Sequence, residues 1–428
     1  MRKSVFILIS MVLLCTLKTQ AANKLLKEGT DFVTDTMALG RFVQITADAP
    51  TDILLKTDVS KISSVEIKPA IRNIQYKIEG NQIRLIGVKP CKVAITVNED
   101  YDKPVYLFVN PPQPKEWSNL PKNTIRFKKG IHQIDKYVIK QDDVTLFLED
   151  GAVLKGDILG ERVKNVRILG YGVVDGRISK RAIRFDYSSG IEINGPIVLS
   201  RNGWSTSFFE CNNLTMKNIK ILSSGSFSDG VDVLATSNVM IDDIFVRNED
   251  DGITLKTKKY KFAGNVEQVK VQNSTFWSGV KGNGLEIGWE LDGEFVRNVR
   301  FENIDIIRKE TSPTKFKRAA ISMHHVGNCK ISDIVYKDIR IESVYENLIW
   351  IELIPANKWG SGGGSIEGVK FENIQYQRGN DAPIVINGGT TGMIKNIEFN
   401  GLKYKGKTVN STTDTMFQIE NAQVLLNK

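Results

Sequence analysis

A repeated unit of strand, polar turn and strand runs through the later part of this 428-residue chain and restricts its fold more than any other feature. Successive copies are 25, 30, 30, 35 and 35 residues apart, and no amphipathic helix of useful length separates them. Short strands and turns at such a period are typical of a β-solenoid, whereas propeller blades need about 40 or more residues. We therefore predict an all-β fold, a right-handed parallel β-helix. The repeated turn residues are Asn218, Asp243, Asn273, Asn303, Asp338 and Asn373.

The N-terminal quarter has a different pattern. Residues 23 to about 110 alternate apolar and polar side chains in short runs, which predicts a small antiparallel β-sandwich. Residues 110–114, Asn-Pro-Pro-Gln-Pro, form a stiff linker after its last strand. The expected organisation is a signal peptide at 1–22, the sandwich at 23–112 and the β-helix at 113–428.

The first residues resemble a secretory signal. Arg2 and Lys3 precede an apolar stretch, and Thr19 and Ala21 provide small residues for cleavage. A lipid anchor on Cys15 is the alternative. We expect a secreted or periplasmic protein with no integral membrane segment after cleavage, while the sequence does not indicate its oligomeric state.

Composition and charge argue against a disordered protein and against a nucleic-acid-binding protein. The chain is 41% hydrophobic and 25% charged, which suits a folded globular protein. Its net charge of +9 could attract an acidic polymer, but the basic residues are scattered and no nucleic-acid motif occurs. The basic stretch 256–261 is expected to be a solvated face. The three His residues lack metal-ligand spacing, so no metal and no other cofactor is expected. We interpret three Cys residues as isolated buried thiols: Cys91, Cys211 and Cys329.

A second strand in each coil can be aligned on an apolar–polar–apolar triplet. Because side chains alternate along a strand, the middle residues should form an exposed outward column. A polar column with an exposed Trp suits a carbohydrate-binding groove, and an ordinary solvated sheet face is the alternative. The column holds Asp232, Thr254, Glu286, Ser322, Trp350 and Val385. The neighbouring outward column holds Lys256, Gly288, His324, Glu352 and Asn387.

Carboxylates stand just before three of these strands. Asp229, Asp251 and Asn283 share one position in successive coils, and Asp250 lies beside Asp251. Each member of this column is followed by Gly, which permits a bend that strict alternation would forbid. If the coils stack, Asp229 and Asp251 should lie about one strand spacing apart, roughly 4.8 Å.

Crowded carboxylates repel one another, so at least one should hold a proton near neutral pH. Such a set could supply the acid and the base of glycoside hydrolysis. The acid would protonate the leaving oxygen and the base would deprotonate a water molecule. Turn-capping Asp residues and a calcium site are the alternatives.

The motifs Ser228-Asp229-Gly230, Glu249-Asp250-Asp251-Gly252 and Gly282-Asn283-Gly284 resemble those of polygalacturonases, glycoside hydrolase family 28. The resemblance covers roughly residues 120 to 400 and includes the Gly-rich stretch 170–176. Two departures stand out. Asn283 replaces the His of that family, and residues 320–323 lack its uronate-binding Arg-Ile-Lys.

Family 49, the dextranases and isopullulanase, is also similar. It places a β-sandwich before a β-helix, has one Asp followed by an adjacent Asp pair one coil later, and lacks the uronate motif. Both resemblances imply inverting hydrolysis. They imply that Asp250 is the general acid, while Asp229 and Asp251 hold and activate water.

The expected partner is a polysaccharide or oligosaccharide, with a neutral α-glucan such as dextran first and a pectic galacturonide second. A polysaccharide lyase, with Lys256 or Lys281 as base, and a non-catalytic glycan-binding solenoid are the other hypotheses. Trp204 and Tyr260 could also stack on sugars. His325 is a further candidate for contact with sugar hydroxyls, with an ordinary surface role as the alternative, and His132 is expected to be structural. The candidate substrate-binding residues are Asp232, Lys256, Asn283, Glu286, Trp289, Ser322, His324 and Trp350.

Overall fold

The computed structural model describes residues 16–19, 22–26, 40–179, 181–311, 318–390 and 393–427. The expected signal segment therefore lies outside the described residues, except for Thr16–Thr19 and Ala22. The chain divides into two compact units, Met1–Lys115 and Glu116–Lys428. Among the described residues, no helix has the length and apolar character needed to cross a membrane.

The first unit is a sandwich of two sheets that share one apolar core, to which Ile53, Leu85, Val93 and Leu107 contribute. The sandwich prediction is confirmed, but its antiparallel character is not complete, because β3 and β9 pair in parallel. Most of the unit separates β3 from β9 along the chain, so no short hairpin turn forces these two strands to run antiparallel. One sheet contains β1 (Thr16–Thr19), β2 (Ala22–Leu26), β4 (Thr51–Lys56), β6 (Gln75–Glu79) and β7 (Gln82–Val88). The other contains β3 (Arg41–Thr46), β5 (Val65–Lys68), β8 (Cys91–Val97) and β9 (Val105–Asn110), and the short helices are η1 (Ala70–Arg72) and η2 (Lys115–Asn119).

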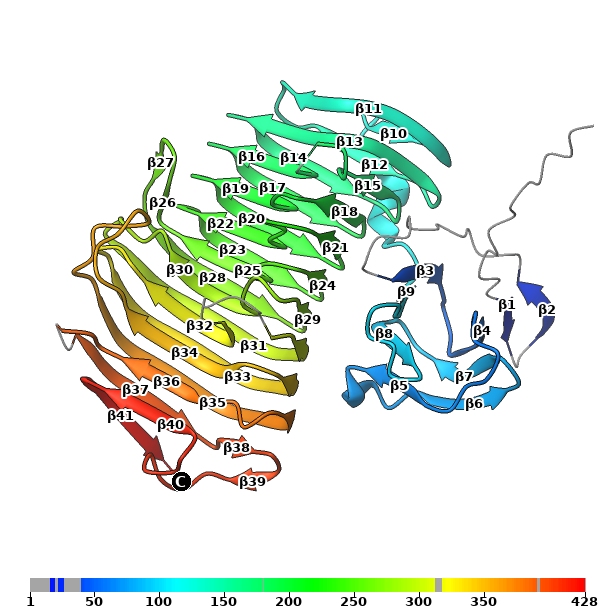
Figure 1. The fold of residues 1–428 in the computed structure, drawn as a ribbon. Coiled ribbons are helices and arrows are strands. Elements are labelled where there is room, and N and C mark those ends of the chain that lie inside the picture. Colours follow the sequence, from blue (N-terminus) through cyan, green and yellow to red (C-terminus); the bar gives the residue numbers. More distant parts are fainter. Residues whose placement is uncertain are drawn as a thin grey trace, which may run out of the picture. The chain divides into compact units, whose positions relative to one another are not determined.

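The second unit is a parallel β-helix, as predicted, with coils stacked from β10 to β41 (Figure 1). Strand pairing between coils defines three faces. Face 1 contains β10 (Ile125–Phe127), β12 (Thr145–Leu148), β14 (Lys164–Leu169), β17 (Ser189–Asn194), β20 (Asn212–Lys217), β23 (Ser237–Asp242), β28 (Val266–Gln272), β37 (Ile394–Asn400) and β41 (Ala422–Asn427). Face 2 contains β15 (Val173–Asp175), β18 (Ile197–Arg201), β21 (Lys220–Ser224), β24 (Phe245–Asn248), β29 (Thr275–Ser278) and β38 (Lys403–Tyr404).

Face 3 follows face 2 in each coil and carries the aligned triplets. It contains β16 (Ile183–Asp186), β19 (Thr206–Phe209), β22 (Val231–Leu234), β25 (Ile253–Lys256), β30 (Leu285–Trp289), β32 (Ala319–His325), β34 (Asn347–Leu353), β36 (Ile384–Asn387) and β40 (Phe417–Glu420). Longer strands turn from one face to the next: β11 (Gly130–Ile139), β13 (Ala152–Glu161), β31 (Phe295–Lys309), β33 (Lys330–Val344) and β35 (Ser365–Gly379). A hairpin, β26 (Lys258–Lys259) and β27 (Phe262–Ala263), follows β25, and β39 (Lys407–Thr408) pairs with β38.

The repeat has a physical basis in the turn between faces 1 and 2. All six repeated Asn and Asp residues adopt φ between 52° and 57°, a left-handed conformation that Asn and Asp tolerate better than most residues. Inside the coils, the rings of Phe301, Tyr336 and Phe371 stack at 4.9 and 5.0 Å. That separation is close to the spacing of neighbouring strands, so one aromatic per coil fills the core without a gap.

The predicted register of face 3 is confirmed. Asp232 pairs with Thr254, Thr254 with Glu286, Glu286 with Ser322, Ser322 with Trp350, and Trp350 with Val385.

Candidate active site

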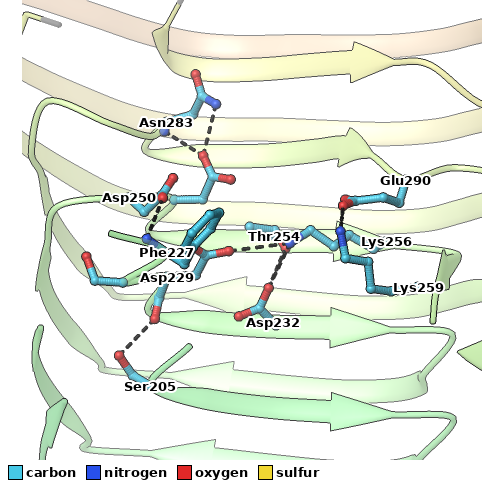
Figure 2. A network of polar contacts seen from close by, with 12 residues as sticks. Ser205, Phe227, Asp229, Asp232, Asp250, Thr254, Lys256, Lys259, Asn283 and Glu290 are labelled. Carbon is cyan, nitrogen blue, oxygen red and sulfur yellow. Dashed lines mark hydrogen bonds and ion pairs between the residues drawn. The ribbon is translucent and has the colours of Figure 1, made fainter. Parts of the chain in front are cut away.

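Three carboxyl groups meet at the turns that lead from face 2 into face 3. Asp229 precedes β22, and Asp250 precedes β25 in the next coil (Figure 2). Asp251 follows Asp250 directly in the chain. One carboxyl oxygen of each lies within 4.8 Å of those of the other two. We call these residues the Asp trio. Asp229 and Asp251 are buried, and Asp250 is half-buried.

Glycines allow the turns to stack, but not for the expected reason. Gly230, Gly252 and Gly284 do not adopt positive φ. Instead, a Cβ atom at each would lie 2.4 to 2.5 Å from a carbonyl oxygen of the next coil. A Cβ at Gly282 would lie 2.0 Å from the carbonyl carbon of Asp250. The motif therefore requires glycine because the backbones of adjacent turns approach so closely.

Asn283 holds Asp251 in place. Its backbone N–H and side-chain Nδ2 donate to Oδ1 of Asp251 at 2.7 and 2.9 Å, and its own Oδ1 accepts from the backbone N–H of Ala319 at 2.8 Å. Asn283 is fully buried. The amide therefore supports the carboxyl group from behind, although the sequence had suggested contact with substrate.

Asn248 supports the turns of the site, and the sequence analysis missed it. Its buried Nδ2 donates to the carbonyl oxygens of Asp250 and Asp251, each at 2.7 Å, and to that of Ser228 at 3.2 Å. One amide thus ties together the two turns that carry the Asp trio. Its place at the end of β24 gave no signal, because a lone Asn before an acidic pair has no specific pattern. The carboxyl group of Asp250 accepts from the backbone N–H of Phe227 at 3.1 Å.

Lys256 provides a positive charge beside the trio. Its Nζ donates to Asp232 at 2.9 Å and to Asp229 at 3.4 Å (Figure 2). The side chain is buried, so the prediction that residues 256–261 form a solvated face is wrong for Lys256. It is wrong for Thr257 too, which is fully buried. The hairpin β26–β27 does project, and Tyr260 on it is 69% exposed.

Burial and mutual repulsion keep protons on the trio. Burial raises the pKa of Asp251 to about 7, helped by the charges of Asp250 and Glu286 and opposed by Arg318 and Lys256. Burial, with repulsion from Asp232, also raises the pKa of Asp229 well above its usual value. The cluster therefore holds at least one proton near neutral pH and can supply both an acid and a base.

The outward column of face 3 is not exposed, contrary to our expectation. Asp232, Thr254, Glu286 and Ser322 are fully buried, and Trp350 is only 6% exposed. Thr254 donates to Asp232 at 3.2 Å, and Ser322 donates to Glu286. Burial alone would raise the pKa of Glu286, but bonds from His324 and Ser322 outweigh it and lower the pKa.

Aromatic residues lie beside this column. The indole of Trp289, which remains partly exposed, stacks on His324 with ring centroids 4.8 Å apart. Nδ1 of His324 bonds to Glu286 at 3.0 Å. Trp350 donates from Nε1 to Glu352 at 2.8 Å. Among the candidate substrate-binding residues, Trp289 alone keeps a partly exposed side chain.

The structure also places the remaining Trp, His and Cys residues that the sequence analysis singled out. Trp204 is 8% exposed and contacts Lys256 and Arg181, so it is not an open platform for sugars. His325 is buried and bonds to the carbonyl of Cys329, which excludes a surface role. His132 bonds to the carbonyl of Lys128 and packs edge-on against Phe127, a structural role as expected. Cys211 and Cys329 are buried as expected, whereas Cys91 is only half-buried.

The spacing of the trio would also suit oxygen ligands of a divalent cation. Lys256, however, already brings a positive charge to Asp229, and Asp251 already accepts two hydrogen bonds. These contacts leave the carboxyl groups less suited to a cation than their spacing alone suggests. A hollow of about 430 Å³ on face 1, lined by Asn213, Met240, Lys270 and neighbouring residues, belongs to a different surface and contains no carboxylate cluster.

A parallel β-helix whose turns bring three carboxyl groups together defines the class of protein: a solenoid with a site suited to acid–base hydrolysis. The model of the glycosyl hydrolases family 28 matches residues 121–426. The chain belongs to this family.

A curated relative is the endo-polygalacturonase of Pectobacterium carotovorum subsp. carotovorum, 26% identical over 210 residues. The match covers 48% of this chain and 46% of the relative, about half the length of each. Among solved structures, Dex49A from Penicillium minioluteum is similar with a TM-score of 0.63 and 12% identity, over 97% of this chain and 94% of that one. An exopolygalacturonase from Thermotoga maritima has a TM-score of 0.53 and 16% identity, over 71% and 83% of the two chains. A polygalacturonase from Erwinia carotovora ssp. carotovora has a TM-score of 0.53 and 15% identity, over 70% and 89%. At these identities, the likeness to solved structures concerns the fold.

Proposed function

We propose that the protein hydrolyses glycosidic bonds of a polysaccharide or oligosaccharide at the Asp trio. The observation that carries the proposal is the meeting of three carboxyl oxygens within 4.8 Å at one end of face 3, with pKa values raised by burial at Asp229 and Asp251. Hydrolysis of such a bond needs one carboxylic acid and one carboxylate at the same pH.

Accessibility suggests the roles. Asp250 is the member of the trio that remains half-buried, so it delivers the proton to the leaving oxygen. Asp229 and Asp251 hold the attacking water, and the ionised member of the pair takes its proton. The three groups are near enough to exchange a proton through one water molecule, so a proton kept by the buried pair remains available to Asp250.

A neutral glycan, with an α-glucan such as dextran first, is the proposed substrate class. A uronic acid needs cations at the site, and residues 320–323 contain none. Lys256 is already bonded to Asp229 and Asp232, and the charges of Glu290 and Asp251 also act on it. Arg318 acts on Asp251.

A pectic galacturonide is the second candidate. The relative from Pectobacterium is an endo-polygalacturonase, and the chain's net charge of +9 would attract an acidic polymer. The Asp trio gives this candidate less support, because its carboxyl groups would repel a uronate. We also propose export of the protein, on the strength of its N-terminal sequence.

The test is release of reducing sugar from dextran, pullulan, polygalacturonate and rhamnogalacturonan, with Asp250→Asn as the control. We expect release from dextran or pullulan and at least a hundredfold loss in the variant. Release from polygalacturonate alone would transfer the proposal to the second candidate. An ultraviolet-absorbing, unsaturated product would indicate a lyase. Binding without release, unchanged in Asp250→Asn, would indicate a glycan-binding solenoid.

A further inference from the structure

Lys256 has an unusual environment for a lysine. It ends β25 with its side chain on the outer side of face 3, yet it is only 4% exposed. Its ammonium group lies 2.9 Å from an oxygen of Asp232 and 3.4 Å from an oxygen of Asp229. A buried charge is costly unless it is paired, so this lysine is built into the site and does not serve a solvated surface.

An aromatic ring provides a second contact for the ammonium group. Nζ of Lys256 lies 4.3 Å from the ring centroid of Trp204. The indole stacks on Phe209 at 5.8 Å, and the guanidinium group of Arg181 also lies over it, at 5.6 Å. Because the face of an indole attracts cations, Trp204 helps to fix where the ammonium group lies. Trp204 therefore contacts the ammonium group of Lys256, a cation that belongs to the protein itself.

We propose that Lys256 is a tethered cation that positions the carboxylate of Asp229 and allows the Asp trio to keep an ionised base during the reaction. The inference rests on the proposed hydrolase function, because it assigns a task to Asp229. The charged groups around Lys256 are Asp229 and Asp232 from β22 and the turn before it, Asp251 before β25, and Glu290 after β30. Within the trio, Asp250 acts on Asp229 and Asp251, Arg318 also acts on Asp251, and Arg181 lies beyond Trp204.

This role differs from the lyase base and from the substrate contact that the sequence suggested for Lys256. Burial alone would lower its pKa, but Asp232 and Asp229 outweigh burial and raise the pKa well above its usual value. A lysine that stays protonated cannot be the base of a lyase. It also cannot receive a uronate carboxylate without giving up its bonds to two buried carboxylates.

The test compares Lys256→Met, Lys256→Arg and the control Lys270→Met on the glycan that the reducing-sugar test identifies. Lys270 lies on face 1 and pairs with Glu302 at 2.8 Å, away from the trio. Loss of a cation makes nearby carboxylates harder to ionise, so the pH optimum of kcat in Lys256→Met should rise by about one to three units. We expect kcat to fall at least tenfold and KM to change less than about threefold. Lys256→Arg should keep the wild-type optimum, and Lys270→Met should match the wild type. An unshifted optimum, or an effect confined to KM, would overturn the proposal.

A second measurement does not depend on activity. In Lys256→Met, the buried carboxyl groups have lost their counter-charge and stay protonated to higher pH. As pH rises from 4 to 8, the Tm of this variant should therefore fall more than the Tm of the wild type. The difference in Tm between the two proteins should therefore become less favourable to the variant as pH rises. A constant difference across this range would refute the electrostatic role. If the Tm difference changes as expected but no glycan is cleaved, the proposed function fails and the tethered cation stands.

Discussion

Replacing Asp251 by Asn should abolish activity and stabilise the protein, a combination that few substitutions produce. The folded protein raises the pKa of Asp251 from 3.8 to about 7, first through burial and then through Asp250 and Glu286. A carboxyl group whose pKa is raised on folding gives up stability as pH rises. Below about pH 3.8 both the folded and the unfolded chain hold the proton, so nothing is lost. Between about pH 4 and 7 only the folded chain holds it, and the free energy of unfolding falls until the folded group also ionises.

The magnitude follows from the shift of about three pKa units. Each unit corresponds to about 1.4 kcal/mol, so Asp251 costs at most about 4 kcal/mol of stability above pH 7. Asn at this position carries no charge, and its Oδ1 can still accept the two hydrogen bonds that Asn283 donates. We expect Asp251→Asn to be about 2–4 kcal/mol more stable than the wild type at pH 8 and close to it at pH 4. Its kcat should fall by about two to four orders of magnitude, because the trio has lost a carboxyl group.

Denaturant unfolding followed by Trp fluorescence is a suitable assay. All six Trp residues lie between residues 117 and 359, so the signal reports the β-helix unit alone. Asp305→Asn is the matched control, since the buried Asp305 pairs with Arg340 at 2.5 Å and its loss should destabilise the protein at pH 8. If Asp251→Asn is no more stable than the wild type at pH 8, or gains the same amount at pH 4, the argument from a buried and repelled charge is wrong.

Three further outcomes are expected. Asp250→Asn should lose at least a hundredfold in kcat on natural glycans. The loss should be much smaller on aryl glycosides, because their good leaving groups need no general acid. Equal losses on both substrates would show that Asp250 is not the general acid. A metal chelator should leave activity unchanged, since Lys256 provides the cation of the site, and loss of activity restored by calcium would contradict this. The first product should have the inverted anomeric configuration by NMR. The carboxyl oxygens of the trio lie within 4.8 Å of one another, closer than the roughly 6.5–9.5 Å between the carboxyl groups of typical inverting enzymes. A retained configuration would show that one Asp acts as a nucleophile.

The sequence predicted the framework of the site well, because a solenoid repeats its geometry. Apolar side chains at every second position fixed which residues of face 3 point inward, and the repeat aligned one coil with the next. The pairings of Asp232 with Thr254 and of Glu286 with Ser322 follow directly. The position of the trio follows from the same alignment, since Asp229 and Asp251 stand at equivalent turns.

The sequence could not predict which outward residues reach solvent. Alternation gives the direction of a side chain but not what covers it, so Glu286 and Lys256 were expected to be open and are buried. Their burial depends on partners from other coils, such as His324 and Trp204. The contribution of Asn248 was hidden for a similar reason. Its amide bonds to backbone carbonyls, and no side-chain motif records such contacts.

The order of Asp229, Asp251 and Asn283 along their column has a chemical logic. A carboxylate only accepts hydrogen bonds, whereas an amide both donates and accepts. A third Asp at position 283 could not donate to Asp251 and would add a fourth charge to a buried cluster. With Asn there, the side chain supports Asp251 on one side and accepts from the backbone of Ala319 on the other. The column therefore stops being acidic at Asn283, whose side chain supports Asp251 and adds no further charge to the cluster.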